Sequence, residues 1–241
     1  MEESILDSNR FGIKVGKTDG VEFKTTSLDE FKKKGFRLLI ARVSMEDIGL
    51  INLMEDIGFR VKDTQVTYKH DLLNHSYPEH LQSSAEVRQF KSSDTPHVVE
   101  IAKIAFKDYG HYFNDERLAK TKCLEVYADW TYNICTNSDF ADIILIAAEN
   151  DIPTGFLSLK KLQSEGRFYA SAGLHAVNPL HWGKNIGSSL VAAGLDWAQR
   201  MNLQWCEHNV LVTNVPVNRV MIKAGFKPSK PVATMHCWLD I

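Results

Sequence analysis

Polar and apolar positions alternate most regularly along residues 168–177, which predicts a β-strand because successive strand side chains point to opposite faces. One predicted face is apolar throughout and consists of Phe168, Ala170, Ala172, Leu174 and Ala176. The other face is half polar and consists of Tyr169, Ser171, Gly173, His175 and Val177. A strand that is buried on both sides normally carries apolar residues on both. We therefore expect the half-polar face to line a cleft.

A loop and a helix follow this strand, and together they predict a phosphate site. The strand ends at Asn178-Pro179, since proline lacks the N–H that a strand ladder needs. The helix is indicated by apolar residues three or four positions apart, namely Ile186, Leu190, Ala193, Trp197 and Met201. The first turn of a helix has unpaired N–H groups and the positive end of the dipole. We therefore predict that the loop over residues 181–187 binds an anion.

The residue types in this loop suit a backbone that approaches a ligand closely. Gly183 and Gly187 can take a positive φ, and asparagine at position 185 is the next most tolerant residue of that region. A Walker phosphate loop is excluded, because Lys184 does not belong to a Gly-Lys-Ser/Thr pattern, and the dinucleotide fingerprint GxGxxG is absent as well.

The remaining pattern predicts an α/β protein with two parts. Residues 1–72 form an N-terminal α/β half-domain, with strands over 36–43 and 59–72 and a helix over 45–57. Residues 73–84 are polar, contain Pro78 and lack periodicity, so we expect a linker there. Residues 85–241 form the larger domain, in which a strand and two helices precede strands over 142–149, 154–161 and 168–177. After the helix from Ile186 we expect a strand beginning at Val210, a helix to Lys223 and a last strand from Phe226.

Composition narrows the class of protein without identifying a function. The 241 residues are 44% hydrophobic and 24% charged with a formal net charge of −2, which gives no reason to expect a nucleic-acid partner. No run of 18 apolar residues occurs and the N-terminus is acidic and polar, so we expect neither a membrane span nor a signal peptide. The four cysteines lack metal-ligand spacing, which favours free thiols in a reducing cytoplasm and no metal site.

Two segments together resemble the GNAT acyltransferase family. The run WGKNIG over residues 182–187 resembles the family's acyl-CoA pyrophosphate loop, although Trp182 replaces Arg or Gln and Asn185 replaces glycine. Downstream, the run VLVTN over residues 210–214, a helix and then Gly225-Phe226 resemble the family's strand, asparagine, helix and Gly-Phe closure. The resemblance implies a central, mostly antiparallel mixed sheet flanked by helices, and an acyl-CoA co-substrate. It implies that this co-substrate is bound by Trp182, Gly183, Lys184, Asn185, Ile186, Gly187, Ser188 and Asn214.

The chemistry of acyl transfer adds three expectations. The strand edge at Asn178-Pro179 can pair with the amides of the pantetheine arm, so the backbone N–H of Val177 is the natural oxyanion donor. Many family members carry a glutamate on this strand and a tyrosine in the last helix, where this chain has Ser171 and Met221. His175 is then the best remaining base, with a hydrogen-bonded core histidine as the alternative. For Asn214 the alternative is a helix N-cap.

A narrower resemblance covers most of the chain loosely. Residues 111–115, with Leu118, Tyr127, Trp130 and Asn133, resemble sugar-nucleotide N-acyltransferases of the dTDP-fucosamine acetyltransferase type, as do Trp238-Leu239. That resemblance implies a dTDP-linked 3-amino or 4-amino dideoxysugar acceptor, a donor such as acetyl-CoA or 3-hydroxybutanoyl-CoA, a role in O-antigen or capsule synthesis, and allows a homodimer. Candidate substrate-binding residues are His111, Tyr112, Asp115, Trp130, Tyr169 and Ser171, with core or capping roles as the alternative.

Two other functions stay open at this point. The chain can be a GNAT enzyme that acts on another amine, such as a peptide N-terminus, a lysine, a polyamine or a drug. It can also be a non-catalytic acyl-CoA-binding module, since both of the family's usual acid–base residues are replaced, by Ser171 and Met221.

Overall fold

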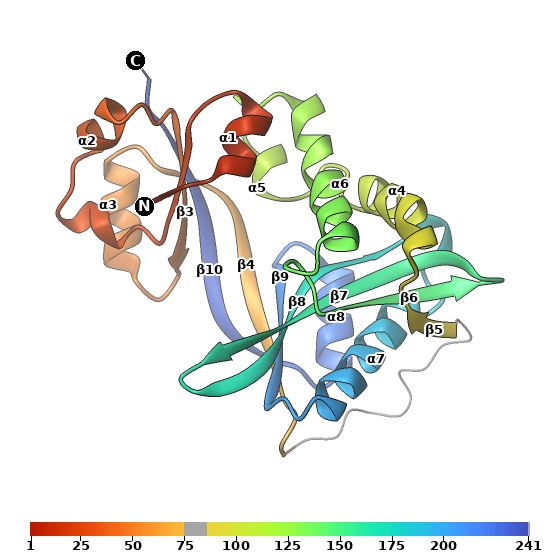
Figure 1. Ribbon diagram of the computed structural model, residues 1–241. Helices are drawn as coiled ribbons and strands as arrows, with labels where there is room; N and C mark the ends of the chain where they lie inside the picture. Colours follow the sequence, from red (N-terminus) through yellow and green to blue (C-terminus); the bar gives the residue numbers. More distant parts are fainter. Residues whose placement is uncertain (75–85, 241) are drawn as a thin grey trace.

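The computed structural model describes residues 1–74 and 86–240, and their strands form one ten-stranded sheet (Figure 1). The strand order is β1-β2-β3-β10-β4-β9-β8-β7-β6-β5. The N-terminal strands are β1 (Glu2–Glu3), β2 (Val15–Thr18), β3 (Leu38–Ser44) and β4 (Arg60–Asp71). The others are β5 (Glu86–Gln89), β6 (Ile143–Glu149), β7 (Ile152–Ser164), β8 (Arg167–Val177), β9 (Trp205–Leu211) and β10 (Lys227–Trp238).

The sheet is mixed and mostly antiparallel, as predicted. Only β2 with β3 and β8 with β9 run parallel among the strand pairs of the described residues, and every other neighbouring pair is antiparallel. The last strand, β10, lies between β3 and β4, so residues 1–74 share the sheet with the rest of the chain. The sheet therefore runs across the predicted boundary near residue 73. The predicted linker lies mostly outside the described residues.

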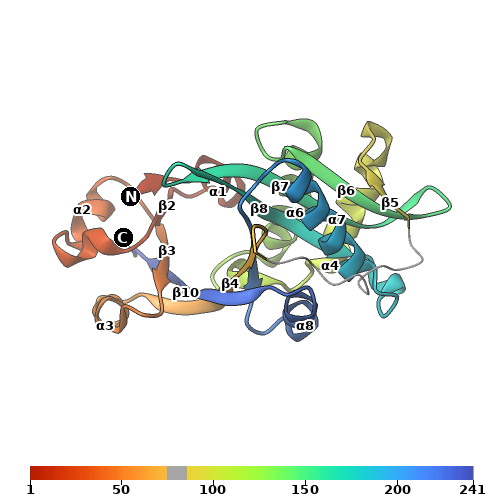
Figure 2. The ribbon, with the colours of Figure 1, turned by 90° about the horizontal axis from the view of Figure 1, so that it is seen from below.

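Helices cover both faces of the sheet. One face packs against α1 (Ile5–Phe11), α4 (Thr95–Ala105), α5 (Gly110–Phe113) and α6 (Lys120–Thr136). The opposite face packs against α2 (Leu28–Lys33) and α3 (Ile48–Asp56) at one end and α7 (Ile186–Arg200) and α8 (Val215–Lys223) at the other. Figure 2 shows α3 and α8 on the same side of β10 and β4. We call these the α6 face and the α7 face.

The hydrophobic cores follow from this layering. Leu157, Leu190 and Leu195 belong to the core under α7, while Ile146 and Phe156 belong to the core under α4 and α6. A third core around Phe59 and Met54 anchors α3. Burial of apolar side chains in these cores supplies the main favourable free energy of folding.

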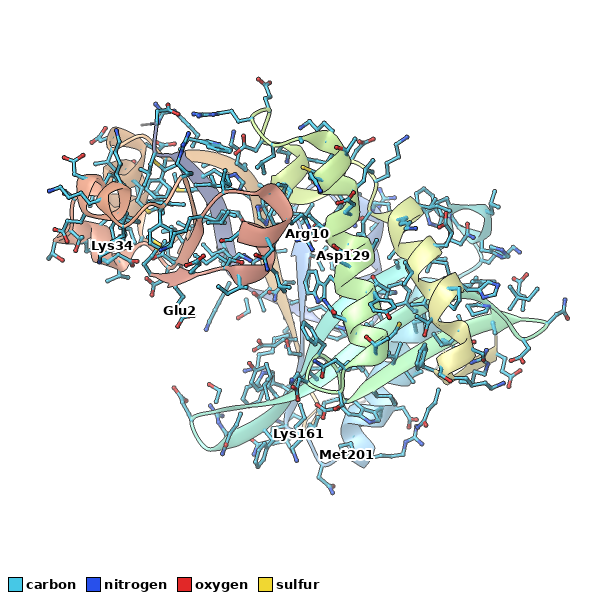
Figure 3. The ribbon with its side chains drawn as sticks, turned by 45° about the horizontal axis from the view of Figure 1, so that its top comes forward. Glu2, Arg10, Lys34, Asp129, Lys161 and Met201 are labelled. Atoms are coloured by element: carbon cyan, nitrogen blue, oxygen red, sulfur yellow. The ribbon has the colours of Figure 1, made fainter. Side chains whose placement is uncertain are left out.

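Side-chain contacts tie the N-terminal segment to the helices of the larger part. Arg10 on α1 pairs with Asp129 on α6 at 3.1 Å (Figure 3), and Tyr112 on α5 donates a hydrogen bond to Asp7 on α1 at 3.0 Å. Asp7 is buried and also pairs with Lys17 on β2 at 2.6 Å. Residues 1–24, for which the pattern gave no prediction, therefore contribute both an edge of the sheet and a helix that packs on α6.

The prediction that β8 alternates regularly is wrong, because the strand contains a β-bulge. Leu157 of β7 lies opposite His175 and Leu159 lies opposite Ala172, so β8 carries one extra residue between them. The Ser158 hydroxyl accepts a hydrogen bond from the extra backbone N–H, that of Leu174, at 2.9 Å. The side chains therefore change faces at Gly173.

This change of faces moves the predicted cleft residues apart. Ala172 packs toward the α7 core, whereas Leu174 and Ala176 belong to the α6 core. His175 and Val177 consequently lie on the α7 face, and Tyr169 and Ser171 lie on the α6 face. The two predicted groups are on opposite sides of the sheet.

The sequence pattern located most other elements of the larger part within a few residues. The main exception is β9, which spans Trp205–Leu211. The sequence pattern predicted that this strand would begin at Val210. The four cysteines are free thiols, as predicted. Across residues 1–74 and 86–240 the structure contains no helix long and apolar enough to span a membrane.

Candidate active site

The central feature of the site is the point where β8 and β9 stop pairing. They pair only at Ala170 with Cys206 and at Ser171 with Glu207, although β8 continues to Val177 and β9 to Leu211. Parallel strands that separate in this way leave a row of backbone groups on the β8 edge without a neighbouring strand. The sequence predicted an open strand edge at Asn178-Pro179, and the strands separate earlier, after Ser171.

Two backbone N–H groups of β8 point to that open edge. The N–H of Asn178 donates to the carbonyl of Thr154 on β7 at 2.8 Å. Because successive N–H groups along a strand point to opposite edges, those of Val177 and His175 point away from β7. The Val177 carbonyl on the same edge accepts a hydrogen bond from the Trp182 indole at 3.0 Å. The edge thus presents donors, and Trp182 covers its nearest acceptor.

The loop before α7 has the backbone geometry that its residue types predicted. Gly183 has φ +80° and Asn185, the N-cap residue of α7, has φ +64°. Residues 182–185 are exposed, while Ile186 and Ser188 are buried in the first turn of the helix. The expectation of a positive φ at Gly187 is wrong, since this residue is helical. The loop therefore places backbone N–H groups at the surface beside a helix N-terminus.

Lys184 is engaged in an ion pair and is not a free cation in this loop. Its ammonium lies 3.2 Å from a carboxylate oxygen of Glu149 at the end of β6, and His181 lies 3.5 Å from the same oxygen. The hydrogen bond from Lys184 is the main cause that lowers the pKa of Glu149. Lys184 is exposed and Glu149 is partly exposed, so the pair positions the loop more than it stabilises the fold.

Gly187 lets the first turn of α7 lie close to His175. A Cβ on Gly187 would be 3.5 Å from Nε2 of His175. Both ring nitrogens of His175 are buried and make no hydrogen bond in the described part of the chain, and burial lowers the pKa of His175 to about 4. A histidine with that pKa is neutral at pH 7 and accepts a proton weakly. The predicted role of His175 as a base stays a prediction, and its side chain lies on the α7 face.

The α6 face opposite carries a polar and aromatic surface near the point where β8 and β9 separate. Tyr169 stacks on Trp205 with ring centroids 4.8 Å apart, and the Lys69 ammonium lies 4.0 Å from the Trp205 ring. The Trp205 indole donates to Glu207 at 2.8 Å, and Glu207 is paired with Ser171. Sequence reasoning missed Trp205 and Glu207, because it placed the start of this strand at Val210. The run WCEHNVL over residues 205–211 does not alternate between apolar and polar residues, so no periodic signal marked them.

Three of the predicted substrate-binding residues are instead part of a buried network. His111 Nδ1 lies 2.8 Å from His236 Nε2, and His236 Nδ1 lies 2.6 Å from Asp115. Tyr112 is buried and bonded to Asp7. These contacts fix α5 to β10 and to α1, which corresponds to the core role named as the alternative.

The charges in this network are set by burial and by hydrogen bonds. Burial alone would raise the pKa of Asp115, but the hydrogen bonds from His236 and Trp238 outweigh it and hold that pKa well below its usual range. Burial lowers the pKa of His111 well below its ordinary value. Asp115 is therefore a carboxylate at neutral pH, and it accepts hydrogen bonds from donors that would otherwise be buried without partners.

Trp130 stands at the exposed end of a row of aromatic rings on α6. It is 40% exposed and its ring centroid lies 6.2 Å from that of Tyr127. Tyr127 in turn stacks on Phe106 at 4.6 Å and meets the edge of Tyr109 at 5.8 Å. Trp130 is thus accessible to a ligand, whereas Tyr127 is held rigidly by its neighbours.

Asn214 has the capping role that was the alternative reading. Its side-chain oxygen accepts a hydrogen bond from the Val217 N–H at 3.3 Å, at the N-terminus of α8. The Tyr109 hydroxyl lies near the same point: burial raises its pKa, and the neighbouring Asn214 and Leu211 partly offset that rise. Met221 is fully buried, so no ionisable side chain replaces the missing tyrosine of the family at that position.

Gly110 provides a test of how tightly α5 is packed near these groups. It has φ +77°, and a Cβ there would lie 2.8 Å from the Tyr127 hydroxyl, which the surrounding rings prevent from moving. We expect Gly110→Ala to lower the free energy of unfolding by roughly 2 kcal/mol or more, from backbone strain plus the clash. Gly166→Ala is the control, because Gly166 has φ +75° with nothing within 4 Å, and should cost about 1 kcal/mol. Equal losses of unfolding free energy in the two variants, measured by urea unfolding, would show that Gly110→Ala does not clash with Tyr127.

A cavity of about 340 Å³ lies beside α4 and reaches the loop at Asn178 and His181. Its lining includes Glu100, Ile101, Thr154, Asn178 and His181. None of the predicted site residues lines it, and we assign it no role. Within residues 1–74 and 86–240 no group of three or more histidine, cysteine, aspartate or glutamate side chains is arranged to hold a metal ion.

Solved structures share this fold at low sequence identity. A tandem GNAT protein from the clavulanic acid biosynthesis pathway is 16% identical with a TM-score of 0.62, over 87% of this chain and 66% of that one. A GCN5-related N-acetyltransferase from Sphaerobacter thermophilus is 12% identical with a TM-score of 0.59, over 88% and 66%. A functionally unknown conserved protein from Staphylococcus epidermidis is 12% identical with a TM-score of 0.59, over 95% and 85%. The chain spans just under two thirds of the first two structures, and at these identities the likeness shows the fold alone.

The family is shown by a match over the larger part of the chain. No curated protein matches the sequence. The family model described as an acetyltransferase (GNAT) domain matches residues 85–227, which is more than half of the 241 residues. This match includes the pyrophosphate-like loop and the Gly225-Phe226 closure on which the resemblance rested. The chain belongs to the GNAT acetyltransferase family.

Proposed function

We propose that this protein transfers an acyl group from acyl-CoA to the amino group of a small acceptor, by direct attack in a ternary complex. The observation that carries the proposal is the separation of β8 and β9 directly beside the loop at residues 182–187. An extended ligand arm can pair with the open β8 edge while its diphosphate lies at the N-terminus of α7.

The donor would be held mainly by backbone groups. The exposed residues 182–185 and the first turn of α7 offer N–H groups to the diphosphate. The N–H groups of His175 and Val177 would face the pantetheine arm and the thioester carbonyl. In this arrangement the Trp182 indole must release the Val177 carbonyl when an amide of the arm takes its place. Acetyl-CoA is the simplest donor, and the longer hydroxybutanoyl group is a finer proposal for the same site.

The reaction needs little help from a general base. An amine with a pKa near ~8 is about one-tenth neutral at pH 7, a cost of roughly 1.4 kcal/mol. One oxyanion donor supplies about 3 kcal/mol in other enzymes, and enzymes supply about 8 to 23 kcal/mol in total. The neutral nitrogen attacks the thioester carbon, the C–S bond breaks, the nitrogen loses a proton and the thiolate of CoA gains one. The placement of the two substrates therefore contributes more to catalysis than proton removal by His175, whose low pKa makes it a weak base.

The proposed acceptor site involves accessible residues more than buried ones. A dTDP-linked aminosugar stays a candidate from the sequence resemblance, with Trp130, Tyr169 and Ser171 as the accessible residues that could contact it. His111, Tyr112 and Asp115 would act only indirectly, since they are buried in the network with His236 and Asp7. Membership of O-antigen or capsule synthesis and a homodimer rest on the same resemblance.

The experiment combines binding and turnover on the full chain. Calorimetric titration of CoA tests the donor site, and a thiol-release assay with acetyl-CoA tests turnover on dTDP-aminosugars, lysine peptides, polyamines and simple alkylamines. We expect CoA binding and release of CoA with at least one amine. CoA binding without turnover on any amine would favour the non-catalytic acyl-CoA-binding module, which the residues at positions 171 and 221 make the second candidate. Absence of CoA binding would contradict both.

A further inference from the structure

Asp63 on β4 is a buried carboxylate without a hydrogen-bond partner in the described part of the chain. Its side chain is 8% exposed, and both carboxylate oxygens are fully buried and unbonded. An uncompensated buried charge costs several kcal/mol of folding free energy, so native proteins rarely keep one that serves only the fold.

Two hydroxyl groups beside Asp63, those of Thr234 and Tyr127, can share a hydrogen bond from a donor placed between them, while the cation Arg42 on β3 is exposed and lies opposite Thr234 on the other side of β10. Thr234 lies directly opposite Asp63 on β10, and its hydroxyl is also buried and unbonded within the described residues. At Gly110 a Cβ would lie 2.8 Å from the Tyr127 hydroxyl and 3.7 Å from Oδ2 of Asp63, so both groups face the place where Gly110 has no side chain. Burial, together with the charge of Asp63, raises the pKa of Tyr109 and of Tyr127, which therefore stay protonated.

This cluster lies beside the end of β9, on the α6 face. The Val212 N–H, just after β9, donates to the carbonyl of Thr64 at 3.0 Å, and the Tyr109 hydroxyl lies near Asn214 and Leu211. Along β4, Asp63 shares its face with Lys69, which lies opposite Glu207 in the strand register of β4 and β9. The carboxylate thus lies on the same face as Tyr169 and Ser171, where an acceptor would approach the open edge of β8.

We propose that Asp63 binds the ammonium group of the acceptor, with the Thr234 and Tyr127 hydroxyls as its other hydrogen-bond partners. The inference rests on the proposed function, because it places the amine of that reaction. A primary ammonium has three N–H donors and one positive charge, which match a carboxylate and two hydroxyl oxygens. The substrate class is then a cationic primary amine, and the N-terminal half of the chain supplies the charge that recognises it.

The test is the isosteric variant Asp63→Asn with Asp56→Asn as control, since Asp56 is an exposed carboxylate at the end of α3 on the opposite face. With the best amine of the thiol-release panel, we expect Asp63→Asn to raise the KM for the amine about 10- to 100-fold and to leave the Kd for CoA within twofold. The Asp63→Asn Tm should equal or exceed that of the unchanged protein, because a buried charge is removed. Asp56→Asn should change none of these values.

Equilibrium binding of a charged probe and its neutral isostere keeps the inference separate from turnover. Saturation-transfer NMR with n-butylammonium and n-butanol on the CoA-saturated protein should show binding of the ammonium alone, lost in Asp63→Asn. Ammonium binding without turnover would contradict the proposed function and leave Asp63 as an ammonium site. An unchanged KM or unchanged ammonium binding in Asp63→Asn would overturn the inference. So would equal binding of both probes, binding of neither, or a fall in Tm accompanied by loss of CoA binding, which would indicate a structural role.

Discussion

Replacing Asp115 by alanine is expected to lower the free energy of unfolding by about 3 kcal/mol or more, the largest stability effect of any single change considered. Asp115 is 1% exposed and accepts hydrogen bonds from His236 at 2.6 Å, from the Trp238 indole at 3.0 Å and from the Arg117 N–H at 3.0 Å. Alanine leaves these donors unsatisfied in a buried place. Urea unfolding followed by circular dichroism measures the loss.

The control for this change is Asp240→Ala. Asp240 pairs with Arg117 at the surface, so its loss should alter stability by less than about 0.5 kcal/mol. Similar losses for the two variants would show that the buried network contributes no more than a surface ion pair. That result would show that the buried network does not hold α5 against β10.

At acidic pH we expect a smaller difference in the free energy of unfolding between the unchanged protein and Asp115→Ala. The pKa of Asp115 in the folded protein is lowered, so its contribution to stability is fully present above the unfolded value of about 3.9 and is lost as pH falls toward the folded pKa. Unfolding curves at pH 7 and near pH 3 test the sign. A difference that stays constant or widens in acid would contradict the lowered pKa.

Replacing Asn185 by isoleucine is expected to weaken CoA binding at least tenfold. Asn185 has φ +64° at the N-cap of α7, and a β-branched residue there costs about 1 to 3 kcal/mol of strain. The loop relieves that strain by changing its backbone angles, which moves the N–H groups that would hold the diphosphate. Calorimetric titration of CoA measures the effect.

Asn185→Gly is the matched control, since glycine adopts this φ freely and the Asn185 side chain makes no capping hydrogen bond. It should bind CoA within about threefold of the unchanged protein. If isoleucine bound CoA as tightly as glycine does, the loop geometry would not be what holds the ligand, and the proposed donor site would fail with it.

Local features of the site were predictable because their causes are local. The positive φ at Gly183 and Asn185 follows from residue type, and α7 follows from its own apolar period. The strand break at Asn178-Pro179 follows from proline chemistry. Each of these needs only neighbouring residues, so one sequence suffices to predict it.

The errors arose where distant residues decide the structure. The bulge in β8 depends on Ser158 of the neighbouring strand, so no pattern within residues 168–177 indicated that His175 and Ser171 face opposite sides. His111 was assigned to a pocket from the family resemblance, and its core role had no local signal because its partner, His236, is 125 positions away. Asp63 had no local signal at all, since only its burial beside β10 makes it unusual.

The position of β10 between β3 and β4 has a consequence for synthesis on the ribosome. Chains are made from the N-terminus, and compact units usually fold as they emerge. Here β3 and β4 are not direct sheet neighbours, and β10, which is translated long after both, pairs with each of them and lies between them. Until β10 is made, the edges of β3 and β4 that face it stay unpaired, and chaperones that shield such edges should matter more for this protein than for one whose neighbouring strands follow each other in sequence.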